Sequence, residues 1–323
     1  MLRSQLLATA LAFAAAVSSP SHAGEARQVR IVKQPGLAYL PLIVMRELRL
    51  IEKRVPGVQV EWRQLTSGPV IRDAMIAGQI DIGSGGFPPF ALAIDKGLNW
   101  KAVGALNEMP LFLNCGKATI RSLKDLGPND RIALPAIGSV QHIILQMEAD
   151  KELGDPRKLD RQVVAMAHED ATAALLSHRE ITCHLSGPPY QYEQLRSPGI
   201  VKVFDSYEPM GGPHNFNLVW TSEEWARQNP KLLAGFVAAM REAMEFIGRE
   251  PLEASRLYVR SEKSGSTPEQ IAEIIQKPGI KYTMTPNGMS RFMSFMAKTG
   301  AIKSARPSWR DYALPHLHEL PGS

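Results

Sequence analysis

Polar side chains without charge gather in five loops, each following a segment that the sequence predicts to be a β-strand. The loops span residues 34–40, 65–68, 83–87, 135–142 and 184–190, and they contain no Asp, Glu, Lys or Arg. They hold Gln34, Tyr39, Thr66, Ser67, Ser84, Ser139, Gln141, His142, His184, Ser186 and Tyr190. All of these except Gln141, together with His214 and Asn215, are our candidate ligand-binding residues. Ligands of open parallel sheets bind beyond the carboxyl ends of the strands, so we expect the loops to converge.

The chemistry of such a site is hydrogen-bond donation without formal charge. Several of the loops begin helices, and helix N-termini present unpaired N–H groups and a partial positive charge that bind anions. Hydroxyl groups add further donors. The alternative is that each Ser or Thr only caps its helix. For five loops that converge, we favour a site for an oxyanion or a small neutral molecule held by many hydrogen bonds.

The motifs of common catalytic sites are missing. The chain has no GxSxG elbow, no HExxH, no P-loop and no GxGxxG. His168, Glu169 and Asp170 form a cluster that we interpret as a solvated helix cap, with Asp170 at the N-cap. We therefore expect a binding protein rather than an enzyme, with no cofactor and no metal.

Composition restricts the partners further. The net charge is +5 over 323 residues, 44% of the residues are hydrophobic, and Lys and Arg form no run, which argues against a nucleic-acid partner. The two cysteines, Cys115 and Cys183, are too few for a disulfide scaffold. They can form one disulfide or remain buried thiols, and both alternatives stay open.

Residues 1–23 have the pattern of a cleaved signal peptide. Arg3 precedes an apolar run from Leu6 to Val17, and Ser21-His22-Ala23 supplies small residues for cleavage after Ala23. The run is shorter than the roughly 20 residues that span a bilayer, so we disfavour a membrane anchor. No cysteine lies near the cleavage site. We expect a soluble protein in the periplasm of a Gram-negative cell.

Strands and helices alternate along the first two thirds of the chain, which predicts parallel βαβ units. Expected strands are 29–32, 58–62, 80–83, 111–115, 131–134, 162–166, 181–185 and 217–220. Expected helices are 41–51, 70–77, a segment ending at Gly97, 120–126, 139–151 and 170–178, and another begins at Pro188. The C-terminal part is helical, with helices 230–249, 251–259, 268–276 and 286–298. Aromatic and Met residues at 292–296 are expected in the core.

One pattern occurs twice, about 100 residues apart. Residues 74–85 and 174–187 each contain a helix end, a tight turn, a short strand and a Ser-Gly pair. Either the two halves share one βα architecture, or the similarity is that of any two βα units.

The chain resembles the periplasmic substrate-binding proteins of ABC importers, in the nitrate/sulfonate/taurine/thiamine-precursor family. The segments that carry the resemblance run through nearly the whole chain after residue 23. They are Gly36-Leu37-Ala38-Tyr39-Leu40-Pro41, Ala77–Gly83, Ile120–Leu126, Gly138-Ser139, Pro188-Pro189-Tyr190, Asn229-Pro230 and Gly300-Ala301-Ile302-Lys303.

The resemblance implies an α/β fold of type II periplasmic binding proteins: two doubly wound α/β lobes joined by two crossover strands, with a helical C-terminal part. The crossovers would lie near 111–114 and 218–221. Lobe one would comprise residues 24–111 plus 220–323, and lobe two residues 112–219. The implied partners are a small-molecule solute and the permease and ATPase subunits of an importer, with the chain itself a monomer.

Some residues depart from the family pattern beside the expected cleft. His178 and Thr182 stand where the family usually has Gly and Asp, and His184 and Ser186-Gly187 replace a more aromatic stretch. With His142 and His214, these residues favour a carboxylate or heteroaromatic ligand. Two alternatives remain: a sensor that docks on a membrane signalling protein, and an enzyme similar to the pyrimidine synthases of this fold. The isolated cysteines and the export signal argue against the enzyme.

Overall fold

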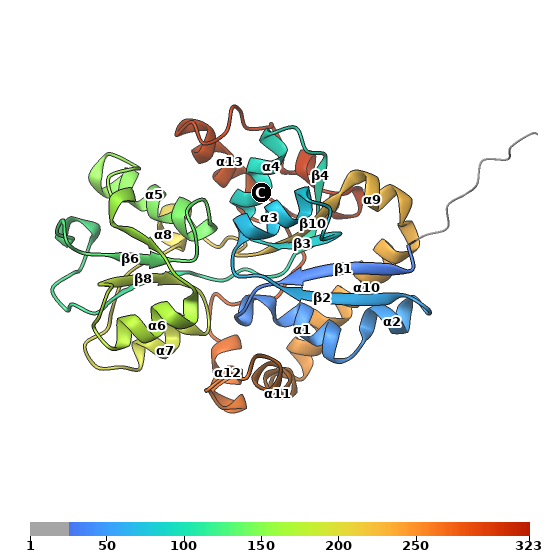
Figure 1. Cartoon of the computed structure of the whole chain (residues 1–323), viewed down its shortest axis with the longest axis horizontal. Coiled ribbons are helices and arrows are strands. Elements are labelled where there is room, and N and C mark those ends of the chain that lie inside the picture. The colour runs from blue at the N-terminus through green and yellow to red at the C-terminus, as the bar shows by residue number, and fades with distance from the viewer. Residues whose placement is uncertain (1–25) are drawn as a thin grey trace, which may run out of the picture.

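The computed structural model describes residues 26–323 and has two lobes, each built on a five-stranded sheet (Figure 1). The predicted signal peptide at 1–23 lies outside the described residues. The first sheet has the order β2-β1-β3-β10-β4. Its strands are β1 (Gln28–Lys33), β2 (Gln59–Gln64), β3 (Ile82–Gly85), β4 (Trp100–Ala105) and β10 (Leu218–Ser222).

The second sheet has the order β7-β6-β8-β5-β9, which repeats the topology of the first. Its strands are β5 (Phe112–Cys115), β6 (Ile132–Leu134), β7 (Val163–Ala165), β8 (Cys183–Ser186) and β9 (Val201–Asp205). In both sheets the second position holds a strand that is parallel to both of its neighbours, β1 or β6, and the fourth position holds a strand of opposite direction, β10 or β5.

Both sheets are mixed, whereas the alternation of strands and helices predicted parallel pairing. β1 pairs in parallel with β2 and β3, but β10 runs antiparallel to β3 and β4. In the same way β5 runs antiparallel to β8 and β9. The segments expected as crossovers therefore belong each to one sheet, β5 to the second and β10 to the first, and the chain passes between the lobes just before each of them.

Helices cover both faces of each sheet. In the first lobe α1, α2, α10 and α11 pack together, and α4 packs with α3 and α13. In the second lobe α5 packs with α8, and α6 with α7. The helices are α1 (Leu40–Glu47), α2 (Leu50–Arg54), α3 (Gly68–Ile76), α4 (Phe87–Asp95), α5 (Val140–Leu153), α6 (His168–Leu176), α7 (Tyr190–Leu195), α8 (Tyr207–Met210), α9 (Glu223–Gln228), α10 (Pro230–Arg249), α11 (Pro251–Glu262), α12 (Pro268–Ile275) and α13 (Met289–Lys298).

The helices predicted to begin at Pro230, Pro251 and Pro268 are confirmed, whereas the helix expected from residue 286 begins at Met289. α10 has Pro at its first position and buries one face, with Leu232, Phe236, Met240 and Ile247 inside. The expected helix 41–51 is instead two helices, because Arg49 takes a left-handed conformation (φ 52°) between α1 and α2. The sequence analysis did not include β4 and β9.

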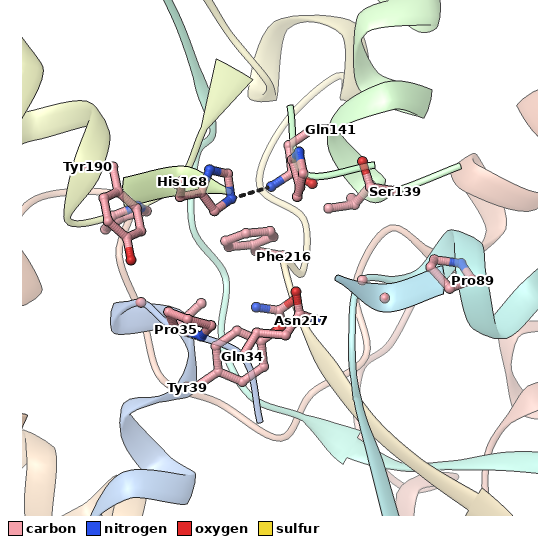
Figure 2. A pocket seen from close by; sticks show the side chains of 18 residues that line it. Gln34, Pro35, Tyr39, Pro89, Ser139, Gln141, His168, Tyr190, Phe216 and Asn217 are labelled. Carbon is pink, nitrogen blue, oxygen red and sulfur yellow. Dashed lines mark hydrogen bonds between the residues drawn. The ribbon is translucent and has the colours of Figure 1, made fainter. Parts of the chain in front are cut away.

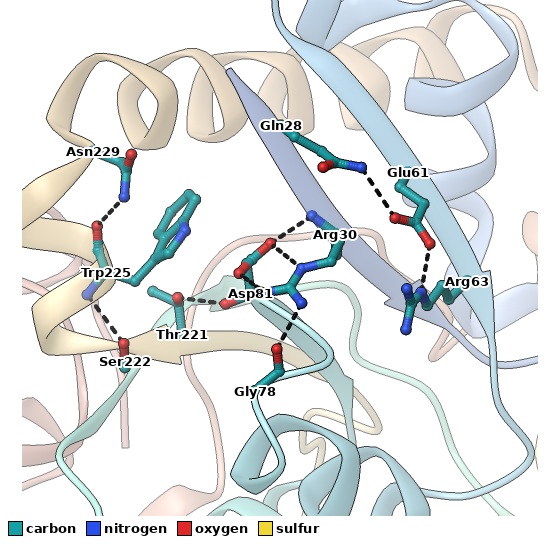
Figure 3. Close-up of polar contacts among 10 residues, drawn as sticks. All are labelled: Gln28, Arg30, Glu61, Arg63, Gly78, Asp81, Thr221, Ser222, Trp225 and Asn229. Carbon is teal, nitrogen blue, oxygen red and sulfur yellow. Dashed lines mark hydrogen bonds and ion pairs between the residues drawn. The ribbon is translucent and has the colours of Figure 1, made fainter. Parts of the chain in front are cut away.

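The echoed segments adopt the same turn. Gly78 has φ 67°, and His178 at the corresponding place has φ 53°, so both enter the next strand through a left-handed residue. In the first copy Asp81 accepts from Nε and Nη2 of Arg30 at 3.0 and 2.6 Å, and its carbonyl accepts from Thr221, which ties β1, β3 and β10 together (Figure 3). In the second copy Thr182 instead donates to Asp130 at 2.9 Å.

The two cysteines are joined. Cys115 in β5 and Cys183 in β8 are register partners and form a disulfide across 68 residues of sequence. This decides the question that the sequence left open. Within residues 26–323, the structure contains no helix with both the length and the apolar character to cross a bilayer.

Candidate functional site

A small cavity lies between the lobes, where the strands of both sheets end (Figure 2). Its volume is about 20 Å³, counted as the room for the centre of a water molecule, which is close to what one water needs. The lining residues are Gln34, Pro35, Gly36, Ala38, Tyr39, Gly68, Gly86, Pro89, Pro135, Ser139, Val140, Gln141, His168, Gly187, Pro188, Tyr190, Phe216 and Asn217. None of them is Asp, Glu, Lys or Arg, so the walls are polar without formal charge.

Four of the predicted ligand-binding residues line this cavity: Gln34, Tyr39, Ser139 and Tyr190. Gln34 follows β1 and belongs to the first lobe, whereas Ser139 is the N-cap of α5 in the second and accepts from the backbone N–H of His142 at 3.3 Å. The first N–H groups of a helix have no acceptor inside it, so the start of α5 offers donors at the cavity.

The predicted Ser and Thr residues of the first lobe do not line it. Thr66 is exposed to solvent, and Ser67 is buried at the N-cap of α3. Ser84 donates to the carbonyl of Val32 at 2.6 Å, so its hydroxyl is used inside the sheet. Ser186, in the second lobe, is fully buried in β8 and is also absent from the lining. Ser84 and Ser186 lie in β3 and β8, where successive side chains point to opposite faces of the sheet, so a correctly predicted loop need not bring them to the cavity.

The three histidines that favoured a carboxylate or heteroaromatic ligand do not line the cavity either. His142 accepts from the N–H of Gly138 and lies 3.2 Å from Asp160. His214 is fully buried and lies 2.8 Å from the hydroxyl of Ser206. His184 is buried inside the second lobe, as described below.

Asn215 has a structural role. Its Nδ2 donates to the carbonyls of Asn107 and Thr285, at 3.0 and 3.1 Å, and its Oδ1 accepts from the N–H of Asn287. These bonds join the segment before β10 to the C-terminal part of the chain. The side chain is therefore fully used away from the cavity.

His168 is a lining residue that the sequence analysis interpreted as part of a solvated cap. It is the first residue of α6, and the N-cap is Ala167 rather than the expected Asp170. Its ring stacks on Tyr190 with centroids 5.2 Å apart, and Nε2 lies 3.2 Å from the amide nitrogen of Gln141 (Figure 2). Burial lowers the pKa of His168 to about 4, so the ring is neutral at pH 7.

Asn217 is the second residue that the sequence analysis missed. Its side chain is 1% exposed, and Nδ2 has no hydrogen-bond partner among residues 26–323. A buried N–H without a partner costs about 1–3 kcal/mol of folding free energy, so we expect this group to serve a function. Asn217 and its neighbour Phe216 line the cavity just before β10.

Glycine permits the close approach of the lobes. A Cβ on Gly86, which precedes α4 in the first lobe, would lie 2.6 Å from Cβ of Val140 in the second lobe. Gly36 has φ 111°, and the next residue, Leu37, donates its N–H to the carbonyl of Pro188 at 3.1 Å across the cleft. A side chain at Gly86 would hold the lobes apart, whereas Gly36 is required for its positive φ.

Within the described residues, no group of three His, Cys, Asp or Glu side chains is arranged to hold a metal ion. The lining offers amide, hydroxyl, imidazole and backbone groups instead. Such a set recognises an oxyanion or a small polar molecule through many hydrogen bonds.

A family model described as the NMT1-like family matches residues 22–257, more than two thirds of the chain. The chain belongs to the NMT1-like family. An Escherichia coli K12 protein named for binding aliphatic sulfonates is 26% identical to this NMT1-like chain over 241 residues, 74% of the chain and 70% of that protein.

Solved structures agree on the fold of the NMT1-like chain. The alkanesulfonate-binding protein SsuA of Xanthomonas axonopodis pv. citri, bound to MOPS, is 20% identical with a TM-score of 0.69, over 90% of this chain and 96% of that one. The periplasmic nitrate-binding protein NrtA of Synechocystis PCC 6803 is 14% identical with a TM-score of 0.72, over 88% and 85%. These confirm the α/β fold of periplasmic binding proteins and the nitrate/sulfonate family inferred from the sequence. The relatives are binding proteins of this kind and not enzymes.

Proposed function

We propose that this chain is the soluble substrate-binding component of an ABC importer. It captures a small anionic or polar organic solute, of the sulfonate, nitrate or carboxylate type, between its lobes and delivers it to a membrane permease with its ATPase. The observation that carries the proposal is the interlobe cavity whose lining has donors from both lobes and no charged side chain. The proteins named for sulfonate and nitrate binding support the same class of solute.

Neutral donors suffice for an anion in such a place. A cleft closed on its solute leaves little room for water, and fixed N–H dipoles then act in a low dielectric, where they are worth more than in water. Asn217 Nδ2, just before β10, and the start of α5 in the second lobe would face the same solute. A buried lysine or arginine would bind the solute more strongly but would also slow its release.

Release requires the lobes to separate, and the contacts across the cleft are of a kind that can break. Lys298 in α13 pairs with Asp150 in α5 at 2.5 Å, and Arg157 donates to the carbonyl of Thr299 at 3.1 Å. On the other rim Ser266 donates to Glu193 at 2.8 Å. Partly exposed pairs of this type contribute about 0–1 kcal/mol each, so the solute itself would decide between the open and closed forms.

The proposal retains the lobe boundaries and location expected from the sequence. Lobe one comprises residues 24–111 plus 220–323, and lobe two residues 112–219. Residues 1–23 direct export to the periplasm and are removed, and the mature chain acts as a monomer. The peptide mass of the exported protein, which should begin near Gly24, tests the cleavage.

Calorimetric titration of the ligand-free mature chain with nitrate, methanesulfonate, acetate and neutral acetamide tests the solute class. We expect at least one anion to bind, with a decrease in the radius of gyration by X-ray scattering as the cleft closes. If acetamide binds and no anion does, the anion-binding part of the proposal is wrong. Uptake by vesicles that contain the cognate permease then distinguishes import from sensing.

A further inference from the structure

A chain of four hydrogen bonds between five side chains runs from the interior of the second lobe to the cavity wall. Its members are Asn114 in β5, Gln194 in α7, His184 in β8, His168 in α6 and Gln141 in α5. The first three are fully buried, with 0% exposure. Only its last two members line the cavity.

A backbone carbonyl determines which side chain donates and which accepts along this series of hydrogen bonds. Nδ2 of Asn114 donates to the carbonyl oxygen of Gln191 at 2.9 Å, and a carbonyl oxygen can only accept. The orientation of the Asn114 amide is therefore fixed. The same Nδ2 lies 3.0 Å from the Gln194 side chain, which must present Oε1 there.

Each following bond then has one possible direction. With Oε1 of Gln194 used, its Nε2 donates to Thr172 Oγ1 at 2.9 Å and to Nδ1 of His184 at 2.7 Å. His184 thus accepts at Nδ1 and carries its proton on Nε2, which lies 2.9 Å from Nδ1 of His168. His168 accepts there, and a neutral ring carries its one remaining proton on Nε2.

The neutral state of both rings has a physical cause. Burial lowers the pKa of His168 to about 4, and burial together with the neighbouring His168 ring lowers the pKa of His184 well below its usual value. Neither ring therefore carries two protons at pH 7, and the directions above hold.

The last bond orients the Gln141 amide. His168 Nε2–H points to the Gln141 side chain at 3.2 Å, so a half-turn of the amide places Oε1 at this contact and its NH₂ group in the cavity. Amide nitrogen and oxygen exchange places in this way without other movement.

We infer that this chain of hydrogen bonds fixes His168 as the Nε2–H tautomer, so that His168 donates to Gln141 and Gln141 presents its NH₂ group, a donor, to the solute. The inference deepens the proposed function, on which it rests for the identity of the site. The solute atoms that face this wall are then acceptors, as in a fully deprotonated oxyanion. Gln141 determines specificity, whereas Gln194, His184 and His168 are positioning residues.

The tautomer is measured without a solute. Long-range ¹H–¹⁵N spectra of the ligand-free mature chain at pH 7 report the protonation of each imidazole nitrogen, and a His168→Gln variant assigns the His168 signals. We expect protonated Nε2 and unprotonated Nδ1 for both His168 and His184. A protonated Nδ1 on His168, or a doubly protonated ring, would overturn the inference.

A Gln194→Glu substitution should exchange donors and acceptors along this series of hydrogen bonds. A carboxylate accepts from Nδ1–H of His184, which makes its Nε2 an acceptor and moves the His168 proton to Nδ1. We expect this change in the spectrum and at least a tenfold loss of affinity for nitrate or methanesulfonate, whichever the wild type binds. Gln79→Glu adds the same charge at an exposed turn of the first lobe and is the matched control.

The two proposals fail in different ways. If neither anion binds the wild type while the spectrum shows the expected tautomers, the proposed solute class is wrong and the hydrogen-bond chain stands. If an anion binds and Gln194→Glu changes neither the tautomer nor the affinity, the directional chain is wrong and the binding function stands. A Gln194→Glu protein that does not fold leaves the wild-type spectrum as the decisive measurement.

Discussion

At the scale of single residues, some polar groups of the site have hydrogen-bond partners within the protein, and one buried group does not. Ser139 caps its helix, and Tyr190 donates to Glu169 at 2.7 Å, so both have partners in the protein. Asn217 Nδ2 has none among the described residues, although it is buried. Affinity and stability should therefore respond in opposite ways when Asn217 is changed.

We predict that Asn217→Leu lowers solute affinity about tenfold or more and leaves the ligand-free melting temperature unchanged or higher. Leucine has nearly the same shape and removes an N–H whose burial costs about 1–3 kcal/mol. Titration calorimetry and thermal unfolding of the same preparation measure both effects. A large drop in the ligand-free melting temperature would contradict this account of Asn217.

His214 makes a prediction about pH. Burial lowers its pKa to about 4, whereas an unfolded histidine titrates near 6.5. Between these values the unfolded chain binds the proton and the folded chain does not, so the free energy of unfolding falls as the pH falls. The stabilising contribution is complete above about pH 6.5 and is lost toward pH 4.

We expect a His214→Gln variant to lack this contribution. Its free energy of unfolding should depend less on pH between 6 and 4.5, by up to about 1.4 kcal/mol per pH unit. Urea denaturation at several pH values measures the slope. Equal slopes for variant and wild type would show that His214 titrates at its ordinary pKa.

At the scale of elements, the strand direction explains what the sequence could and could not predict. The rule that ligands bind at the carboxyl ends of strands found Gln34, Ser139 and Tyr190. It missed Phe216 and Asn217 because β10 runs antiparallel and brings its amino end to the same edge of the sheet. Nothing in a single sequence marks that reversal, since β10 has the composition of its parallel neighbours.

His168 was missed for a related reason. Polar residues at the start of a helix have the same sequence pattern whether they form a solvated cap or line a cavity. Only the packing of α6 beside β8, which puts His168 next to His184, separates the two. The same limit applies to Thr66, Ser67, Ser84 and Ser186. Their loops were predicted correctly to approach the cavity, but their side chains do not line it.

The disulfide between β5 and β8 should stabilise the second lobe. Closing a loop of this length is worth about 2–4 kcal/mol in the free energy of unfolding. We predict that the Cys115→Ala/Cys183→Ala variant loses this amount in urea denaturation. Reductant should produce the same loss in the wild type and none in the variant. A wild type that does not respond to complete reduction would refute the prediction.

The glycine before α4 makes a second prediction at this scale. Gly86 has ordinary backbone angles (φ −69°), so Gly86→Ala acts only through its Cβ, which would lie 2.6 Å from Val140. We expect the variant to fold, to close incompletely and to lose about tenfold or more in affinity.

The partner of this contact supplies the control. A Gly86→Ala/Val140→Ala double variant restores the space and should recover most of the affinity. Gly248→Ala, in α10 with nothing within 4 Å of its Cβ, should leave affinity unchanged. If the double variant binds as weakly as Gly86→Ala, the loss does not come from this contact.

At the scale of the whole molecule, the two lobes meet through charged pairs on the rim of the cleft. Lys298 and Asp150 join α13 to α5, and on the same rim the guanidinium groups of Arg157 and Arg291 donate to the carbonyls of Thr299 and Pro209. The charges lie on opposite lobes, so the pair acts only when the cleft is closed.

We predict that Lys298→Glu opens the ligand-free protein and weakens solute binding a few-fold, whereas Lys298→Glu/Asp150→Lys restores both. Like charges across the rim repel when the lobes close, and the exchanged pair attracts again. Scattering in low salt measures the radius of gyration of the three proteins. The single variant should approach the wild type in 1 M salt, where such charges are screened.

The placement of β10 has a consequence for the order in which the molecule folds. The strands of the second sheet come from one continuous stretch, residues 112–205, whereas the first sheet lacks a central strand until residue 222. When the chain emerges N-terminus first, during synthesis or during passage through a membrane, the second lobe can therefore fold before the first lobe is complete. The first lobe forms last, through contacts between residues more than 100 positions apart, and such distant contacts make folding slow.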